Sequence, residues 1–152
     1  MNMARIKEEI GQKRPFRNPH HEALVNLIYT ANWCQDRIKE LLKPHGVTPQ
    51  QYNVLRILRG AGGPISTSVI RERLLDKMSD TSRMVDRLYK KGWVQRQVCL
   101  TDKRLVDVEL SEQGKELLQG LSDIEAELDR ILGGLDPEEA GELSELLNQA
   151  RD

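Results

Sequence analysis

The segment SDTSRMVDRLYKKGWVQRQVCLTDKRLVDVEL, residues 79–110, carries the clearest structural pattern in the sequence. In its first half, Met84, Val85 and Leu88 form a narrow apolar stripe at helical spacing, and the other positions are largely basic or hydroxylic. In its last part, apolar residues at 106, 108 and 110 alternate with acidic ones, which is the period-two pattern of a half-buried strand. The segment therefore predicts a surface helix followed directly by a β-hairpin.

The predicted hairpin has strands at roughly 93–99 and 105–110 and carries charges of both signs at its tip. Asp102, Lys103 and Arg104 occupy that tip. A charged triplet of this kind is most often a solvated turn. Its position after a helix with a basic face favours a second interpretation, in which the triplet binds a polyanion.

Capping residues predict three helices before the hairpin helix. A helix begins after Asn18 with Pro19 in its first turn and runs to about residue 43. A second begins at Thr48, where Pro49 and Gln51 complete a capping box, and it stops at GAGGP. A third begins at Ser66 and ends near Leu75, and the helix of the quoted segment begins at Ser79 and ends at Gly92. Residues 1–17 form either a short helix or a loose arm.

Two helices are predicted after the hairpin, a long one from Ser111 and a last one capped by Asp136. Apolar residues in the long helix recur alternately four and three positions apart, as in helices that pack against other long helices. We expect the last two helices to form a homodimer, through Leu117, Leu121, Ile124, Leu128, Ile131, Leu143 and Leu146. A similar spacing in residues 18–44 is equally consistent with packing within one chain.

Composition restricts the class of protein. The chain has 152 residues, 38% of them apolar, and contains no run of the ~20 apolar residues that a membrane span needs. Its start, MNMARIKEEIGQKR, is not a signal peptide, so we expect a cytoplasmic protein. The net charge is −1, but acidic and basic residues are unevenly distributed along the chain. Residues 105–152 hold 14 acidic and 3 basic residues, whereas residues 71–104 hold 5 acidic and 10 basic residues. Such a chain can present a basic face to a polyanion.

The order and spacing of these elements resemble the MarR-type winged helix-turn-helix transcription regulators. The resemblance rests on VTPQQYNVLRIL, TSRMVDRLYKKGWVQR and TDKRLVDVELSEQGKELL, within residues 48–118, and on the helical flanks. It implies a mainly α (α+β) fold: a single MarR-type domain over residues 1–152. In that domain a winged helix-turn-helix lobe with a two-stranded β-wing (47–110) is flanked by dimerisation helices (18–44 and 111–152).

The resemblance also implies a function, namely sequence-specific binding of double-stranded DNA by a homodimeric repressor on a pseudo-palindromic operator. In this family the wing carries an Asp-x-Arg element, whose Arg enters the minor groove while the Asp orients it; Asp102 and Arg104 occupy those positions. A narrow minor groove concentrates negative potential and favours a guanidinium. The predicted DNA-binding residues are Ser66, Thr67, Ser68, Lys77, Ser79, Thr81, Ser82, Arg83, Arg87, Arg96, Asp102, Lys103 and Arg104.

In many relatives, binding of a small aromatic or anionic effector weakens DNA binding. Here Tyr29 and Trp33, and likewise Tyr52 and Arg56, lie four residues apart and predict an effector pocket, although aromatic residues at this spacing more often belong to a core. A cysteine-based redox sensor of the same fold is an alternative. Cys34 and Cys99 are its candidates, but a structural role is favoured for both.

Two other classes of function are disfavoured. An enzyme is not indicated, because His20, His21 and His45 form no HExxH or partner motif, and GAGGPIST lacks the lysine of a phosphate-binding loop. No metal site or cofactor is predicted, since the two cysteines have no ligand spacing. A winged helix used for protein–protein contacts is the remaining rival, and the basic helix and the charged wing argue against it.

Overall fold

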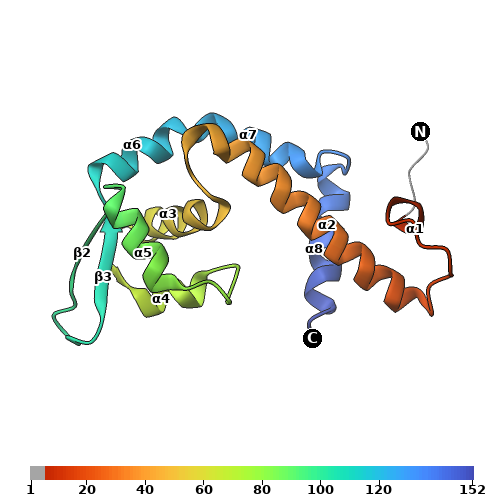
Figure 1. Cartoon of the computed structure of the whole chain (residues 1–152), viewed down its shortest axis with the longest axis horizontal. Coiled ribbons are helices and arrows are strands. Elements are labelled where there is room, and N and C mark those ends of the chain that lie inside the picture. The colour runs from red at the N-terminus through yellow and green to blue at the C-terminus, as the bar shows by residue number, and fades with distance from the viewer. Residues whose placement is uncertain (1–5) are drawn as a thin grey trace. The chain divides into compact units, whose positions relative to one another are not determined.

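The computed structural model describes residues 6–152 and divides the chain into two units, one up to Ile38 and one from Lys39 to Asp152. Helices predominate, and three short strands form a single sheet (Figure 1). None of the helices within the described residues has both the length and the hydrophobicity of a membrane span. The mainly α fold predicted from the sequence is confirmed.

The first unit contains a short helix, α1 (Ile6–Glu9), and most of a long one, α2 (Pro19–Leu42). Asn18 accepts a hydrogen bond from the backbone N–H of His21 at 2.9 Å, so the predicted start of the long helix is correct. The prediction of a short helix or a loose arm covered residues 1–17. Its helical alternative holds for α1, and residues 1–5 lie outside the described part of the chain.

In the second unit a one-turn helix, η1 (Lys43–His45), leads into α3 (Pro49–Ala61). Thr48 and Gln51 form the predicted capping box at the start of α3. The next two helices are α4 (Thr67–Arg73), capped by Ser66, and α5 (Thr81–Lys90). Together α4, the intervening turn and α5 form the helix-turn-helix.

The helix α5 was predicted to begin at Ser79, and this prediction is wrong because the N-cap is the next residue along the chain. Asp80 is the N-cap, and its carboxylate accepts the N–H of Arg83 at 3.1 Å. Ser79 instead donates its hydroxyl to Asp76 at 2.8 Å within the turn. A carboxylate at this position also interacts favourably with the positive end of the helix dipole.

The wing is formed by β2 (Val94–Val98) and β3 (Val106–Leu110), which pair antiparallel over their whole lengths. The sequence did not predict a third strand, β1 (Ile65–Ser66), which pairs with the other edge of β3 to give the order β1-β3-β2. Two residues provide too little periodicity for recognition. Because β1 directly precedes α4, it anchors the start of the helix-turn-helix to the wing.

The long helix predicted from Ser111 is interrupted. It consists of α6 (Glu112–Gly120), α7 (Ser122–Asp129) and a final turn, η2 (Arg130–Leu132), with a break at Leu121. Gly120 has poor helix propensity and precedes the break. The last helix, α8 (Pro137–Gln149), has the predicted capping box between Asp136 and Glu139.

The core of the second unit lies between α3, α5, the sheet and the helices that follow it. Its fully buried large side chains are Leu42, Leu55, Ile70, Leu88, Leu121, Val54 and Val108. Two residues predicted to form the dimer interface, Leu121 and Ile124, are therefore part of the core, since only 1% and 8% of their surfaces are exposed. Side chains that are buried within one chain leave almost no surface for a partner, and the prediction is wrong for these two residues.

Candidate nucleic-acid interface

The outer face of α5 is polar and exposed. Ser82, Arg83 and Arg87 point away from the core, and the side chain of Arg83 is 80% exposed although it pairs with Asp80 at 3.5 Å. The inner face contributes the buried stripe predicted from the sequence. The arrangement leaves a hydroxyl and two guanidinium groups exposed where they can meet phosphates or base edges.

Thr81, a predicted DNA contact, lies on the wrong face of α5. Its side chain is 0% exposed, and its hydroxyl has no hydrogen-bond partner within the described residues 6–152. It therefore does not reach an external ligand. A buried hydroxyl without a partner costs about 1–3 kcal/mol of stability.

Replacing Thr81 by valine is expected to stabilise the protein by about 1 kcal/mol, because valine has nearly the same shape and removes the unpaired hydroxyl. Chemical denaturation would show a higher midpoint with an unchanged slope. Thr81→Ser is the matched control: it keeps the hydroxyl, deletes a methyl group and should destabilise. A valine variant less stable than wild type would show that the hydroxyl is satisfied in solution.

Three other predicted DNA contacts have structural tasks in the helix-turn-helix. The Ser66 hydroxyl caps α4 by accepting the N–H of Val69 at 3.3 Å. The Lys77 ammonium donates to the backbone carbonyls of Arg71 and Glu72 at the end of α4. Ser79 is bound to the turn as described. Thr67 is half-buried and Ser68, exposed in the first turn of α4, lies 3.0 Å from the Ser66 hydroxyl.

The tip of the wing is the most distinctive part of the surface. Arg104 donates from Nε and Nη2 to the two carboxylate oxygens of Asp102 at 3.0 and 2.9 Å, and its backbone N–H donates to the same carboxylate at 3.0 Å. These hydrogen bonds hold the pKa of Asp102 below its usual range and raise the pKa of Arg104. The fork is therefore fixed in direction while the Arg104 side chain remains 89% exposed.

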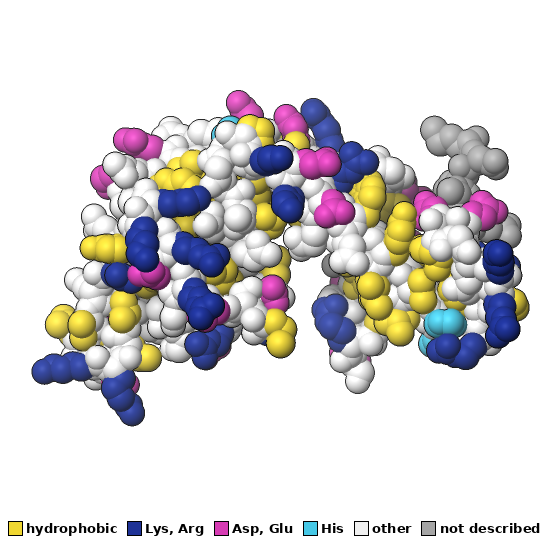
Figure 2. Space-filling model, viewed as in Figure 1, with side chains coloured by type: hydrophobic (Ala, Val, Ile, Leu, Met, Phe, Trp, Pro, Cys, Tyr) yellow, Lys and Arg dark blue, Asp and Glu magenta, His cyan; other side chains and the backbone are white. Residues whose placement is uncertain are grey.

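Lys103 lies beside this pair and is also exposed. In the space-filling view, Lys and Arg side chains project at the tip of the β2–β3 hairpin and recur along α5 (Figure 2). The basic surfaces of the wing and of α5 thus belong to one unit and one face of it.

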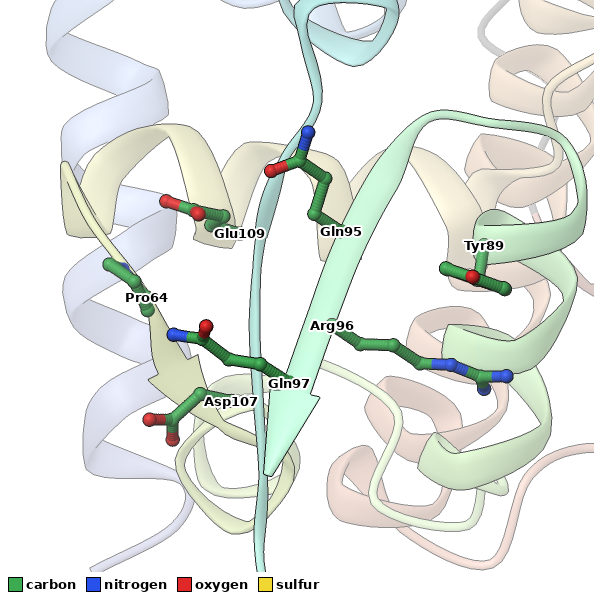
Figure 3. Close-up of a pocket in the computed structure, with 7 residues that line it drawn as sticks. All are labelled: Pro64, Tyr89, Gln95, Arg96, Gln97, Asp107 and Glu109. Carbon is green, nitrogen blue, oxygen red and sulfur yellow. The ribbon is translucent and has the colours of Figure 1, made fainter. Parts of the chain in front are cut away.

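Arg96, another predicted DNA contact, crosses from β2 to α5 (Figure 3). Its guanidinium lies 4.1 Å from the centre of the Tyr89 ring and donates to the Asp86 carboxylate at 3.2 Å. Lys90 pairs with the other oxygen of Asp86 at 2.9 Å. The sequence does not point to Asp86 or Tyr89 as functional residues, because their role depends on a contact between α5 and β2 that no local pattern encodes.

Tyr89 and Arg96 border a cavity of about 310 Å³ on the wing. Pro64 and four polar side chains of the two strands form the rest of its lining (Figure 3). The polar residues are Gln95 and Gln97 of β2 and Asp107 and Glu109 of β3. Within residues 6–152 no group of three or more His, Cys, Asp or Glu side chains is placed to hold a metal ion.

A second cavity, of about 290 Å³, lies between α3 and α7. Tyr52 and Arg56, two of the predicted effector residues, line it, with the Arg56 guanidinium 5.8 Å from the Tyr52 ring centre. Burial, and then the carboxylate of Glu125, raise the pKa of the Tyr52 phenol. The remaining lining residues are Arg59, Glu125, Leu128 and Asp129, of which Arg59 and Glu125 pair at 2.9 Å.

The other two predicted effector residues, Tyr29 and Trp33, lie on α2 in the first unit and are partly exposed. The Arg37 guanidinium lies 5.3 Å from the centre of the Trp33 ring. All residues that line the second cavity belong to the other unit.

Neither cysteine has the surroundings of a reactive thiol. Cys99 is buried, and its sulfur lies 3.1 Å from the Thr101 hydroxyl. Burial raises the pKa of Cys34, which lowers the fraction of nucleophilic thiolate at neutral pH. The redox alternative thus finds no support in the geometry of these two residues.

Residues 47–106 match the model of the MarR family, which spans the helix-turn-helix and most of the wing. An uncharacterised HTH-type transcriptional regulator of Bacillus subtilis, YkoM, is 33% identical over 109 residues, 71% of this chain and 70% of its own length. The multiple antibiotic resistance protein MarR of Salmonella typhimurium is 35% identical over 97 residues, 63% of this chain and 67% of its own length.

Solved structures extend the similarity. A mutant of Escherichia coli MarR, crystallised in complex with operator DNA, superposes with a TM-score of 0.76 at 29% identity, covering 84% of this chain and 93% of that one. The winged helix-turn-helix fold predicted from the sequence is therefore confirmed. By the match of its helix-turn-helix to the family model and by its sequence identity with MarR itself, the chain belongs to the MarR family of transcriptional regulators.

Proposed function

We propose that the protein is a homodimeric transcription repressor that binds a pseudo-palindromic operator in double-stranded DNA. The observation that carries the proposal is the Asp102–Arg104 fork, which directs an exposed guanidinium outward on the same unit as the basic face of α5. A helix that reads the major groove and an arginine that enters the adjacent minor groove are the two contacts a winged helix needs.

The contact between E. coli MarR and operator DNA in its solved complex supports this assignment. A rival function, a winged helix used only for protein contacts, predicts no affinity for DNA. Mobility shift of a random duplex at low salt separates the two, because binding through Lys and Arg releases counterions and weakens steeply as salt rises. Failure to shift DNA at low salt would contradict the proposal.

Exposed apolar side chains on the terminal helices support a homodimer. Leu24, Leu27 and Ile28 of α2 are 44–55% exposed, and Leu146 of α8 is 62% exposed. Leu117, Leu128, Ile131 and Leu143, which were predicted for the interface, are half-buried and retain surface for a partner. Exposed apolar side chains that gather on the same helices are typical of an interface with another chain.

Replacing Leu146 by aspartate is expected to convert the dimer to monomers, because it places a charge in an apolar contact without disturbing the core of either unit. Sedimentation velocity would report the change. Asn148→Asp is the matched control, since it adds the same charge on an exposed position of α8 and should remain dimeric. A wild-type protein that sediments as a soluble monomer would refute the dimer.

The α3–α7 cavity is the effector site that we propose. Its lining includes two carboxylates, and one of them, Glu125, is paired with Arg59; the Tyr52 ring with the Arg56 guanidinium beside it is the part that suits a small aromatic anion. Release of DNA on addition of benzoate-type acids is the corresponding test, with Arg56→Gln expected to abolish the response and to leave DNA binding in the absence of ligand intact. Release that persists in the Arg56 variant would exclude this cavity.

A further inference from the structure

We propose that Arg96 is a positioning residue: held by Asp86 and Tyr89 of α5, it fixes the direction of the wing relative to the recognition helix and does not itself bind phosphate. The inference rests on the proposed DNA-binding function and deepens it. It also changes the role predicted from the sequence, in which Arg96 contacts DNA directly.

The covalent link between the recognition helix and the wing is short. Only residues 91–93 separate α5 from β2, and Gly92 adopts a left-handed φ of 79° there. Backbone hydrogen bonds fix this turn itself, from Gly92 to Tyr89 and from Trp93 to Leu88. The charged tip, however, lies beyond the far end of β2, and strands rise about 3.3 Å per residue. A small rotation at the turn therefore displaces the tip.

Arg96 lies in the middle of β2, between the turn and the wing tip, and its side chain links this strand to α5. One face of its guanidinium stacks on Tyr89 at 4.1 Å, and its Nη1 donates to Asp86 at 3.2 Å. The side chain is 37% exposed, against 89% for Arg104. An arginine engaged by an aromatic ring and a carboxylate has fewer donors left for phosphate than the free fork at the wing tip.

Asp86 is the informative partner. It is a carboxylate on a helix whose exposed face is otherwise basic, and bare negative charge there would repel DNA. Lys90 at 2.9 Å and Arg96 at 3.2 Å neutralise it. If Arg96 contacted phosphate, removing the Asp86 charge would free two cations and tighten binding. If Arg96 positions the wing, the same change releases the tie and weakens binding.

The experiment compares full-length Asp86→Asn, Arg96→Gln and the double variant with wild type. The probes are the duplex that wild type selects from a random pool and a scrambled duplex of equal length, titrated over a series of salt concentrations. Glu112→Gln is the control, because it removes a similarly paired, exposed carboxylate from α6, where its partner is Lys115. Thermal unfolding of each variant accompanies the titrations.

We expect each single variant to lose at least about threefold in affinity for the selected duplex and almost nothing for the scrambled one, since preorganisation is what is lost. The double variant should lose no more than the worse single variant, as for two residues of one interaction. The dependence on salt and the unfolding midpoint should stay unchanged, because no phosphate contact is removed and exposed ion pairs stabilise little. Glu112→Gln should behave as wild type.

Two results would overturn the inference. One is an Asp86→Asn protein that binds the selected duplex more tightly than wild type. The other is an Arg96→Gln protein that loses affinity equally for both duplexes with a salt dependence reduced by about one phosphate contact. A wild-type protein that selects no duplex would overturn the proposed DNA-binding function itself, which is a distinct outcome.

Discussion

Replacing Arg104 by alanine is expected to weaken binding to the selected operator at least about tenfold, the range of a good arginine contact to DNA. The fold and the dimer should be unaffected, because the Arg104 side chain is 89% exposed and, among residues 6–152, bonds only to Asp102. The loss follows from removal of a guanidinium that its contact with Asp102 already directs outward, which reduces the cost of ordering it in a narrow groove. Fluorescence anisotropy with labelled duplex measures it directly.

Two companion variants separate this account from a simple count of charges. Arg104→Lys should recover only part of the affinity, because an ammonium is strongly hydrated and cannot form the two-pronged contact with Asp102. Asp102→Asn should also weaken binding, although it removes a negative charge that phosphates repel. If Asp102→Asn binds more tightly while Arg104→Ala is unchanged, the triplet is only a solvated turn.

Replacing Gly114 by alanine is expected to destabilise the second unit by about 3 kcal/mol or more, the upper range for an overpacked site. Gly114 is buried in the first turns of α6, and a Cβ there would overlap the carbonyl oxygen of Trp93 and lie 3.0 Å from its carbonyl carbon. Backbone cannot move aside as a side chain does. The Ser111 hydroxyl, which donates to the carbonyl of Gly92 and accepts the N–H of Gly114, fixes this approach.

Gly120→Ala on the same helix is the matched control. A Cβ at Gly120 meets nothing within 4 Å, so alanine should be neutral or stabilising by up to about 1 kcal/mol through helix propensity. Chemical denaturation of the two variants measures both effects. Equal stability of Gly114→Ala and wild type would show that α6 does not approach the wing as closely as described.

Local signals in the sequence predicted most of the fold. The caps of α3 and α8 were recognisable because a capping box needs only two residues three positions apart, Thr48 with Gln51 and Asp136 with Glu139. The wing was recognisable from the alternation in β3. By contrast, the apolar spacing continued through Leu121, so it did not reveal that the helix is interrupted there or that Leu121 and Ile124 are buried in the core.

The candidate site was predicted less completely, for the same physical reason. The family resemblance located Asp102 and Arg104, and the structure adds the geometry of their fork. The resemblance could not show that Thr81 faces inward, that Lys77 caps α4 or that Arg96 binds α5. Each of these roles depends on which face of an element packs against a neighbour. Residue type alone made all three look like DNA contacts.

If a two-fold dimer reads DNA through α5 and the wing, the full-length protein should select a pseudo-palindrome from random duplexes. Footprinting should then show half-sites about one helical turn, or 34 Å, apart on one face of the duplex, protected over roughly two turns. A single asymmetric half-site, or protection without any preferred sequence, would contradict this mode of binding.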